Sequence, residues 1–135
     1  MSTHKERAEK SARLEQANEF IRLIASCGRQ FFHHEGCVSQ LEIDARGRVW
    51  LRDKYSGKLV YTHYEQGRWR GFSEGGTLRA LIIALRRYVC HSTPVPRWFF
   101  GEGCYDGNRW GYDAESMGRV RTAAEAFAPG SRQLR

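Results

Sequence analysis

Residues 40–64 read QLEIDARGRVWLRDKYSGKLVYTHY, and this stretch decides the fold. Apolar and polar side chains alternate in three runs, at residues 40–44, 48–52 and 59–64, and alternation is typical of half-buried strands. A glycine in each connection, Gly47 and Gly57, suits a tight turn. The stretch therefore predicts an antiparallel meander of three strands, or of four if residues 68–72 add a short strand.

Amphipathic helices are predicted on both sides of this meander. After it, apolar residues three and four apart predict a central helix with Ser73 or Thr77 as its N-cap; they are Leu78, Leu81, Ile82, Leu85, Tyr88 and Val89. Before it, the same spacing predicts a helix over residues 11–27, which Gly28 ends. A last helix is predicted over residues 114–128.

Together these elements predict an α+β fold. The three- to four-stranded antiparallel meander is expected to pack against the N-terminal and central amphipathic helices, with the C-terminal helix following. A chain of 135 residues has the usual length of one domain. We expect a single domain at residues 11–128, with flexible tails at residues 1–10 and 129–135.

Several classes of protein are disfavoured by the composition. No apolar run is long enough to span a membrane, and the first residues lack the apolar segment of a secretory signal. The four cysteines include no Cys-x-x-Cys pair, and reduced thiols are the rule in the cytosol. We therefore expect a cytoplasmic protein that does not act at a membrane.

The positive charge is concentrated in the middle of the chain. The net charge is +7, and residues 46–87 alone hold ten basic and three acidic residues, an excess equal to that of the whole chain. Arginine outnumbers lysine by 18 to 4, and its planar guanidinium suits phosphate and carboxylate groups. Arginine enrichment also follows from a GC-rich genome, but an anionic partner fits both explanations.

Three kinds of chemical site were weighed, and none is favoured. Cysteines and histidines near residues 27–37 and 90–91 lack the close paired spacing of zinc ligands. The glycine-rich loop before the central helix lacks the Lys-Ser/Thr of a phosphate-binding loop and contains Glu74. His63 could serve Ser73 or Thr77 as a base, but no nucleophile motif surrounds them. We therefore expect no enzymatic activity, no metal and no cofactor.

Basic residues interleaved with aromatic ones give a stronger pattern. Arginine and lysine hold phosphates, whereas aromatic rings stack on bases, although such residues also simply stabilise an exposed sheet face. The candidate partner-binding or nucleic-acid-binding residues are Arg48, Trp50, Arg52, Lys54, Tyr55, Lys58, Tyr64, Arg68, Trp69, Arg70, Arg79 and Arg86.

Part of the chain resembles a group of small proteins from bacteriophages, prophages and integrative elements of proteobacteria. The resemblance extends over about residues 17–127, and its motifs are YSGK at residues 55–58, YTH at residues 61–63 and RGFSEGGTLR at residues 70–79. It implies an accessory protein of a mobile element, a class in which anti-CRISPR inhibitors are familiar. Many anti-CRISPR proteins are acidic mimics of DNA, and the charge of +7 departs from that mode.

Two functions are therefore expected. The first is a non-enzymatic phage accessory protein that binds a host or defence nucleoprotein complex and inhibits or modulates it. The alternative is a regulator that binds DNA or RNA directly through a basic, aromatic sheet face, with an affinity that falls steeply with salt. The sequence assigns no role to the aromatic segment between Trp98 and Tyr112.

Overall fold

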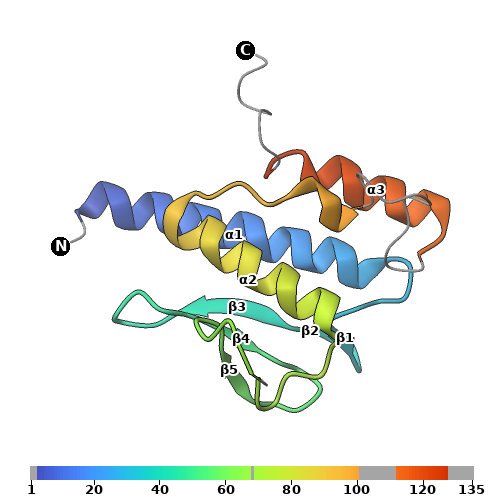
Figure 1. Ribbon diagram of the computed structural model, residues 1–135, viewed down its shortest axis with the longest axis horizontal. Helices are drawn as coiled ribbons and strands as arrows, with labels where there is room; N and C mark the ends of the chain where they lie inside the picture. Colours follow the sequence, from blue (N-terminus) through green and yellow to red (C-terminus); the bar gives the residue numbers. More distant parts are fainter. Residues whose placement is uncertain (1–2, 68, 101–111, 128–135) are drawn as a thin grey trace.

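The computed structural model describes residues 3–67, 69–100 and 112–127. Its elements, in chain order, are α1 (His4–Ser26), β1 (His33–His34), β2 (Cys37–Val38), β3 (Gln40–Ile43), β4 (Val49–Arg52), β5 (Leu59–Tyr61), α2 (Gly76–His91), the 3-10 helix η1 (Arg97–Phe100) and α3 (Ala114–Ala124). The sheet lies along one side of the α1 and α2 layer, and α3 packs on α1 from the other side (Figure 1). The predicted α+β class is confirmed.

The sheet is the predicted meander, with three strands in the order β3-β4-β5. Leu41 pairs with Leu51, and Leu51 with Val60, so one apolar row faces the helices, where all three side chains are buried. The predicted fourth strand is wrong for the part of it that is described, because residues 69–72 form a turn closed by Phe72 N–H donating to the Trp69 carbonyl. A two-residue hairpin, β1 and β2, precedes the sheet.

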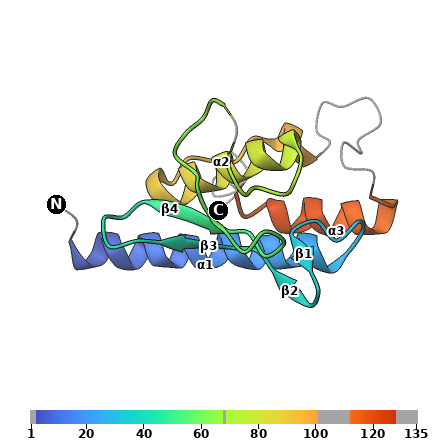
Figure 2. The ribbon, with the colours of Figure 1, turned by 90° about the horizontal axis from the view of Figure 1, so that it is seen from below.

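Helix α1 begins earlier than the sequence pattern predicted, at His4 rather than at residue 11. Thr3 and Glu6 form a capping box, in which each side chain accepts a hydrogen bond from the other residue's backbone N–H. Residues 4–10 are therefore helical rather than part of a flexible tail. The buried side-chain amide of Asn18 donates a hydrogen bond to the Leu41 carbonyl and accepts one from the Leu41 N–H. These two bonds hold β3 alongside α1 (Figure 2).

Helix α2 carries the predicted apolar stripe, whose six members are all buried. Its N-cap, however, is Gly75, without a side-chain hydrogen bond. Ser73 lies two residues before this cap, where its hydroxyl donates to Asp53, and Thr77 lies inside the helix. Arg86, one of the candidate partner-binding residues, is buried at 7% exposure.

The C-terminal helix α3 is confirmed, but it ends at Ala124 and not at residue 128. A turn follows it, in which Phe127 is buried against the rings of Phe20 and Tyr88. One hydrophobic cluster joins this turn to all three helices and the sheet. The predicted tail at residues 129–135 and most of the aromatic segment from Trp98 to Tyr112 lie outside the described residues.

Candidate nucleic-acid interface

On the outer face of the sheet, the predicted arginines have acidic partners. Arg52 Nε lies 2.6 Å from Glu42 Oε2, and Arg48 Nε lies 3.0 Å from Asp44 Oδ2. Trp50 Nε1 also donates to Asp44, at 2.9 Å, and this bond, followed by the Arg48 N–H, holds the pKa of Asp44 far below its usual value. The expectation of a basic sheet face is therefore corrected: the positive charges of this face are balanced.

The predicted aromatic residues also differ in accessibility. Trp69 is 7% exposed, and its ring nitrogen donates to the Tyr64 carbonyl at 2.8 Å, so it cannot stack on an incoming base. Trp50 is half-buried against Tyr61, and the centres of the two rings are 4.8 Å apart. Tyr64, by contrast, is 67% exposed. Among the described residues, the one aromatic ring that it contacts is that of Tyr61, in a T-shaped arrangement.

A second group of predicted residues gathers where two loops meet. The buried carboxylate of Asp53 accepts hydrogen bonds from the backbone of Ser56 and from the backbone and hydroxyl of Ser73. Ser56 in turn donates to the Gly71 carbonyl at 2.6 Å. These bonds bring together four exposed or half-exposed side chains without acidic partners in the described chain, which we call the loop patch: Lys54, Tyr55, Lys58 and Arg70.

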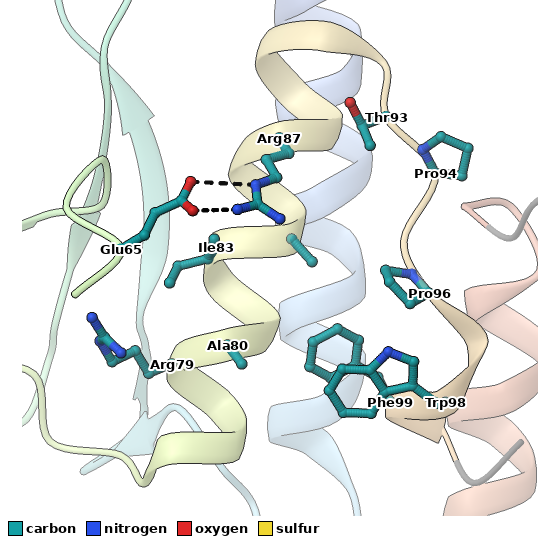
Figure 3. Close-up of a pocket in the computed structure, with 11 residues that line it drawn as sticks. Glu65, Arg79, Ala80, Ile83, Arg87, Thr93, Pro94, Pro96, Trp98 and Phe99 are labelled. Atoms are coloured by element: carbon teal, nitrogen blue, oxygen red, sulfur yellow. Dashed lines mark hydrogen bonds and ion pairs between the residues drawn. The ribbon is translucent and has the colours of Figure 1, made fainter. Parts of the chain in front are cut away.

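A further candidate surface lies on α2 and was not predicted as a site. It is a hollow of about 480 Å³ that we call the α2 groove (Figure 3). The small side chains of α2 form the floor of the groove, and the β5–α2 connection and the segment after α2 form its two sides. The lining residues are Glu65, Arg79, Ala80, Ile83, Ala84, Arg87, Thr93, Pro94, Pro96, Trp98 and Phe99.

Arginine exceeds acid at one side of the α2 groove. Glu65 accepts hydrogen bonds from both Arg86, at 2.6 Å, and Arg87, and these bonds, that of Arg86 first, lower the pKa of Glu65. Arg79 has no carboxylate partner in the described part of the chain and instead lies over the Trp69 ring, 5.0 Å from its centre. Two guanidinium groups therefore share one carboxylate, and that of Arg79 has none within the described residues.

Some guanidinium donors here are buried and lack a hydrogen-bond partner. Within the described residues these are Nε and Nη2 of Arg79 and Nε of Arg86. Stacking on Trp69 partly compensates the charge of Arg79, but a buried donor without an acceptor is destabilising by about 1–3 kcal/mol. The two Arg79 nitrogens have almost no solvent-exposed surface, so an anion reaches them only if the side chain moves away from the Trp69 ring.

The residues weighed for catalysis have structural roles. His63 Nε2 accepts a hydrogen bond from the Val49 N–H at 3.0 Å, and burial, followed by the charges of Arg86, Lys10 and Arg48, lowers its pKa. Ser73 is bonded to Asp53, so the structure does not pair it with His63. Glu74 accepts from the Phe32 N–H. No group of three potential metal ligands is found among the described residues.

Sequence spacing contains a signal for the α2 groove that charge clustering alone misses. Arg79, Ile83 and Arg87 follow one another at intervals of four, and Ala80 and Ala84 lie beside them, so they share one helix face. Glu65 and Trp98 could not be assigned to that groove from sequence, because both lie outside α2. Of the predicted residues, Arg79 and Arg86 belong to this region, and Arg68 lies outside the described part.

None of the helices in the described residues is both long and apolar enough to cross a membrane. Comparison with curated proteins gives no significant match, and neither does comparison with solved structures. A family model described as YoqU matches residues 7–128, which include the sheet, the loop patch and the α2 groove. The chain belongs to the YoqU family.

Proposed function

We propose that this protein is a non-enzymatic accessory protein of a phage or mobile element, which binds a host or defence nucleoprotein complex and inhibits or modulates it. The observation that carries the proposal is the α2 groove, where arginine side chains exceed acids and where Trp98 is 45% exposed. Arginine and tryptophan are the residues that contribute most to binding at interfaces.

The roles of the polar side chains favour binding over catalysis. His63, Ser73, Asp53 and Glu74 each form hydrogen bonds that hold a strand or a loop in place. A nucleophile needs a base within hydrogen-bond reach, and these contacts give His63 and Ser73 other partners. Among the candidate partner-binding residues, those that have no such role are cations and aromatic rings, which bind partners rather than react with them.

Two separate surfaces suit a partner that contains both protein and nucleic acid. The α2 groove combines cations with a ring that can stack. The loop patch combines Lys54, Lys58 and Arg70 with Tyr55, which is 68% exposed and rests edge-on against His34. On the outer face of the sheet, the arginines are paired with acids. The alternative function, a regulator that binds nucleic acid through that face, is therefore less favoured.

Affinity capture from lysates of a host that carries the mobile element tests this proposal. The bait is the folded protein, and the eluate is analysed for protein and nucleic acid with and without nuclease. We expect a complex containing both components, which is reduced by the double change Lys58→Glu and Arg70→Glu. Lys5→Glu with Arg119→Glu is the control, since both of its residues are exposed and it makes the same change in charge away from both surfaces.

Capture of no nucleoprotein by a bait that is shown to be folded would contradict the proposal. A loss of capture that is equal in the loop-patch and control variants would also contradict it, because it would show a dependence on net charge alone.

A further inference from the structure

We infer that the α2 groove binds a short single strand of nucleic acid that crosses α2, with a backbone phosphate at Arg79 and Arg87 and a base stacked on Trp98. This inference rests on the proposed function and names the component of the partner that the groove contacts. Three features of the groove carry it: the phosphate side, the stacking side and the surface between them.

The phosphate side is formed by Arg79 and Arg87. Arg79 has no hydrogen-bond acceptor in the described chain, and two of its nitrogens are buried without a partner. To meet a phosphate, its guanidinium has to turn from the Trp69 ring towards the groove that it lines. Arg87 uses Nε and Nη2 for Glu65, so its Nη1 is left for another acceptor, and its side chain is 47% exposed. Arg86 also pairs with Glu65, so this one carboxylate balances only one of the two positive charges. A phosphate, which brings negative charge and several acceptor oxygens, satisfies what this side lacks.

The stacking side is formed by Trp98 on η1. Its ring lies parallel to that of Phe99, with centres 4.0 Å apart and planes 21° apart, and Phe99 is buried at 3% exposure. The Trp98 ring is therefore supported from behind while almost half of its residue surface stays accessible. Stacking of bases on such a ring is tolerant of sequence.

The surface between the two sides is low and mostly apolar. Ala80 and Ala84 lie there on α2, so a flat base or a sugar can pass over the helix between the arginine side and the Trp98 side (Figure 3). A paired base in a duplex already has both faces covered by its neighbours, so it cannot stack on Trp98 without being unpaired. The groove is therefore suited to a single strand.

Fluorescence anisotropy with a labelled oligothymidylate, over a series of salt concentrations, tests the inference. Arg79→Gln is expected to weaken binding about tenfold or more and to reduce the salt dependence by roughly one phosphate contact. Trp98→Leu is expected to weaken binding by about tenfold, with an unchanged salt dependence, since stacking involves no charge. A duplex of the same length is expected to bind more weakly than the single strand.

Arg97→Gln is the matched control, because Arg97 is an exposed neighbour of Trp98 that does not line the groove. It removes the same charge and is expected to change binding little. Arg79→Lys, which keeps the charge but loses the planar guanidinium, is expected to bind between Arg79→Gln and the wild type. Thermal unfolding of each variant confirms that it is folded.

The inference is overturned if Arg79→Gln and Trp98→Leu bind as Arg97→Gln does, or if a duplex binds as well as the single strand. Competition by inorganic phosphate at low concentration would likewise overturn it in favour of a free-anion site. Its failure is separable from that of the proposed function: nucleoprotein capture that survives Arg79→Gln and Trp98→Leu but not the loop-patch change would leave the proposed function intact.

Discussion

At the scale of single residues, the junction after α1 depends on Gly28. Its φ of +57° lies in the left-handed region, and a Cβ added there would lie 2.3 Å from the Tyr112 ring. Tyr112 is 1% exposed and donates its hydroxyl to the Ile24 carbonyl, and burial raises its pKa above the ordinary value. The ring therefore has little room to move away.

Gly28→Ala is expected to lower the free energy of unfolding by about 2–5 kcal/mol, the sum of left-handed strain and overpacking. Gly36→Ala is the control, because Gly36 has a φ of +82° but no atom near its absent Cβ, so only about 1–2 kcal/mol of strain is expected. Urea unfolding measures both. Equal effects would show that Tyr112 does not restrict residue 28.

His63 makes stability depend on pH. Because the pKa of His63 in the folded protein is below its ordinary value of 6.5, the unfolded chain binds a proton more readily than the folded one. Stability contributed by neutral His63 is therefore present above pH 6.5 and is lost as the pH falls from there towards the pKa of the folded state. Protonation would also remove the acceptor of the Val49 N–H.

We expect the difference in unfolding free energy between pH 8 and pH 5 to be smaller for His63→Gln than for the wild type. The comparison cancels the contributions of other groups, including Glu74, whose pKa is raised by burial. Denaturant unfolding at the two pH values measures it. An identical difference in the two proteins would contradict this role of His63.

At the scale of elements, the loop between β4 and β5 is held to the loop at residues 70–73 by one carboxylate. Asp53 is 1% exposed and accepts hydrogen bonds from Ser56 and Ser73. A side chain at residue 71 would collide with Lys58. The position of the loop patch therefore depends on Asp53.

Asp53→Asn is expected to lower the free energy of unfolding by about 1–3 kcal/mol, since an amide cannot accept all of these bonds. It should also increase amide exchange in both loops. Glu42→Gln, which removes one carboxylate from an exposed ion pair, should change stability by less than about 1 kcal/mol. Similar losses from the two changes, measured by urea unfolding, would show that Asp53 acts only as a surface charge.

Periodic elements could be predicted from sequence, whereas their ends could not. Alternation located β3, β4 and β5, and the stripe from Leu78 to Val89 located α2. The start of α1 was missed because residues 4–10 are polar and make no stripe, and their helix depends on a local capping box. Ser73 was a plausible cap by residue type, but the helix begins at Gly76, and Ser73 instead bonds Asp53 in the preceding loop.

At the scale of the whole molecule, the positive charge is not distributed as the sequence suggested. The sequence showed that basic residues cluster between residues 46 and 87, but it did not show which acidic residue each of them pairs with. Arg52 pairs with Glu42 on the neighbouring strand, and Arg86 pairs with Glu65 in the β5–α2 connection. Among the described residues Arg79 has no acidic partner, and Trp98 reaches the same groove from the segment that follows α2. The site therefore depends on tertiary packing.

The account's central claim is that nucleic acid of the partner complex lies in the α2 groove. Ultraviolet crosslinking of the captured complex, followed by mass spectrometry of the crosslinked peptides, tests it most directly. The account predicts nucleotide adducts on peptides that contain Trp98 or neighbouring groove residues, and their loss in Arg79→Gln but not in Arg97→Gln. Adducts confined to the sheet face or to the loop patch, with none at the groove, would contradict it.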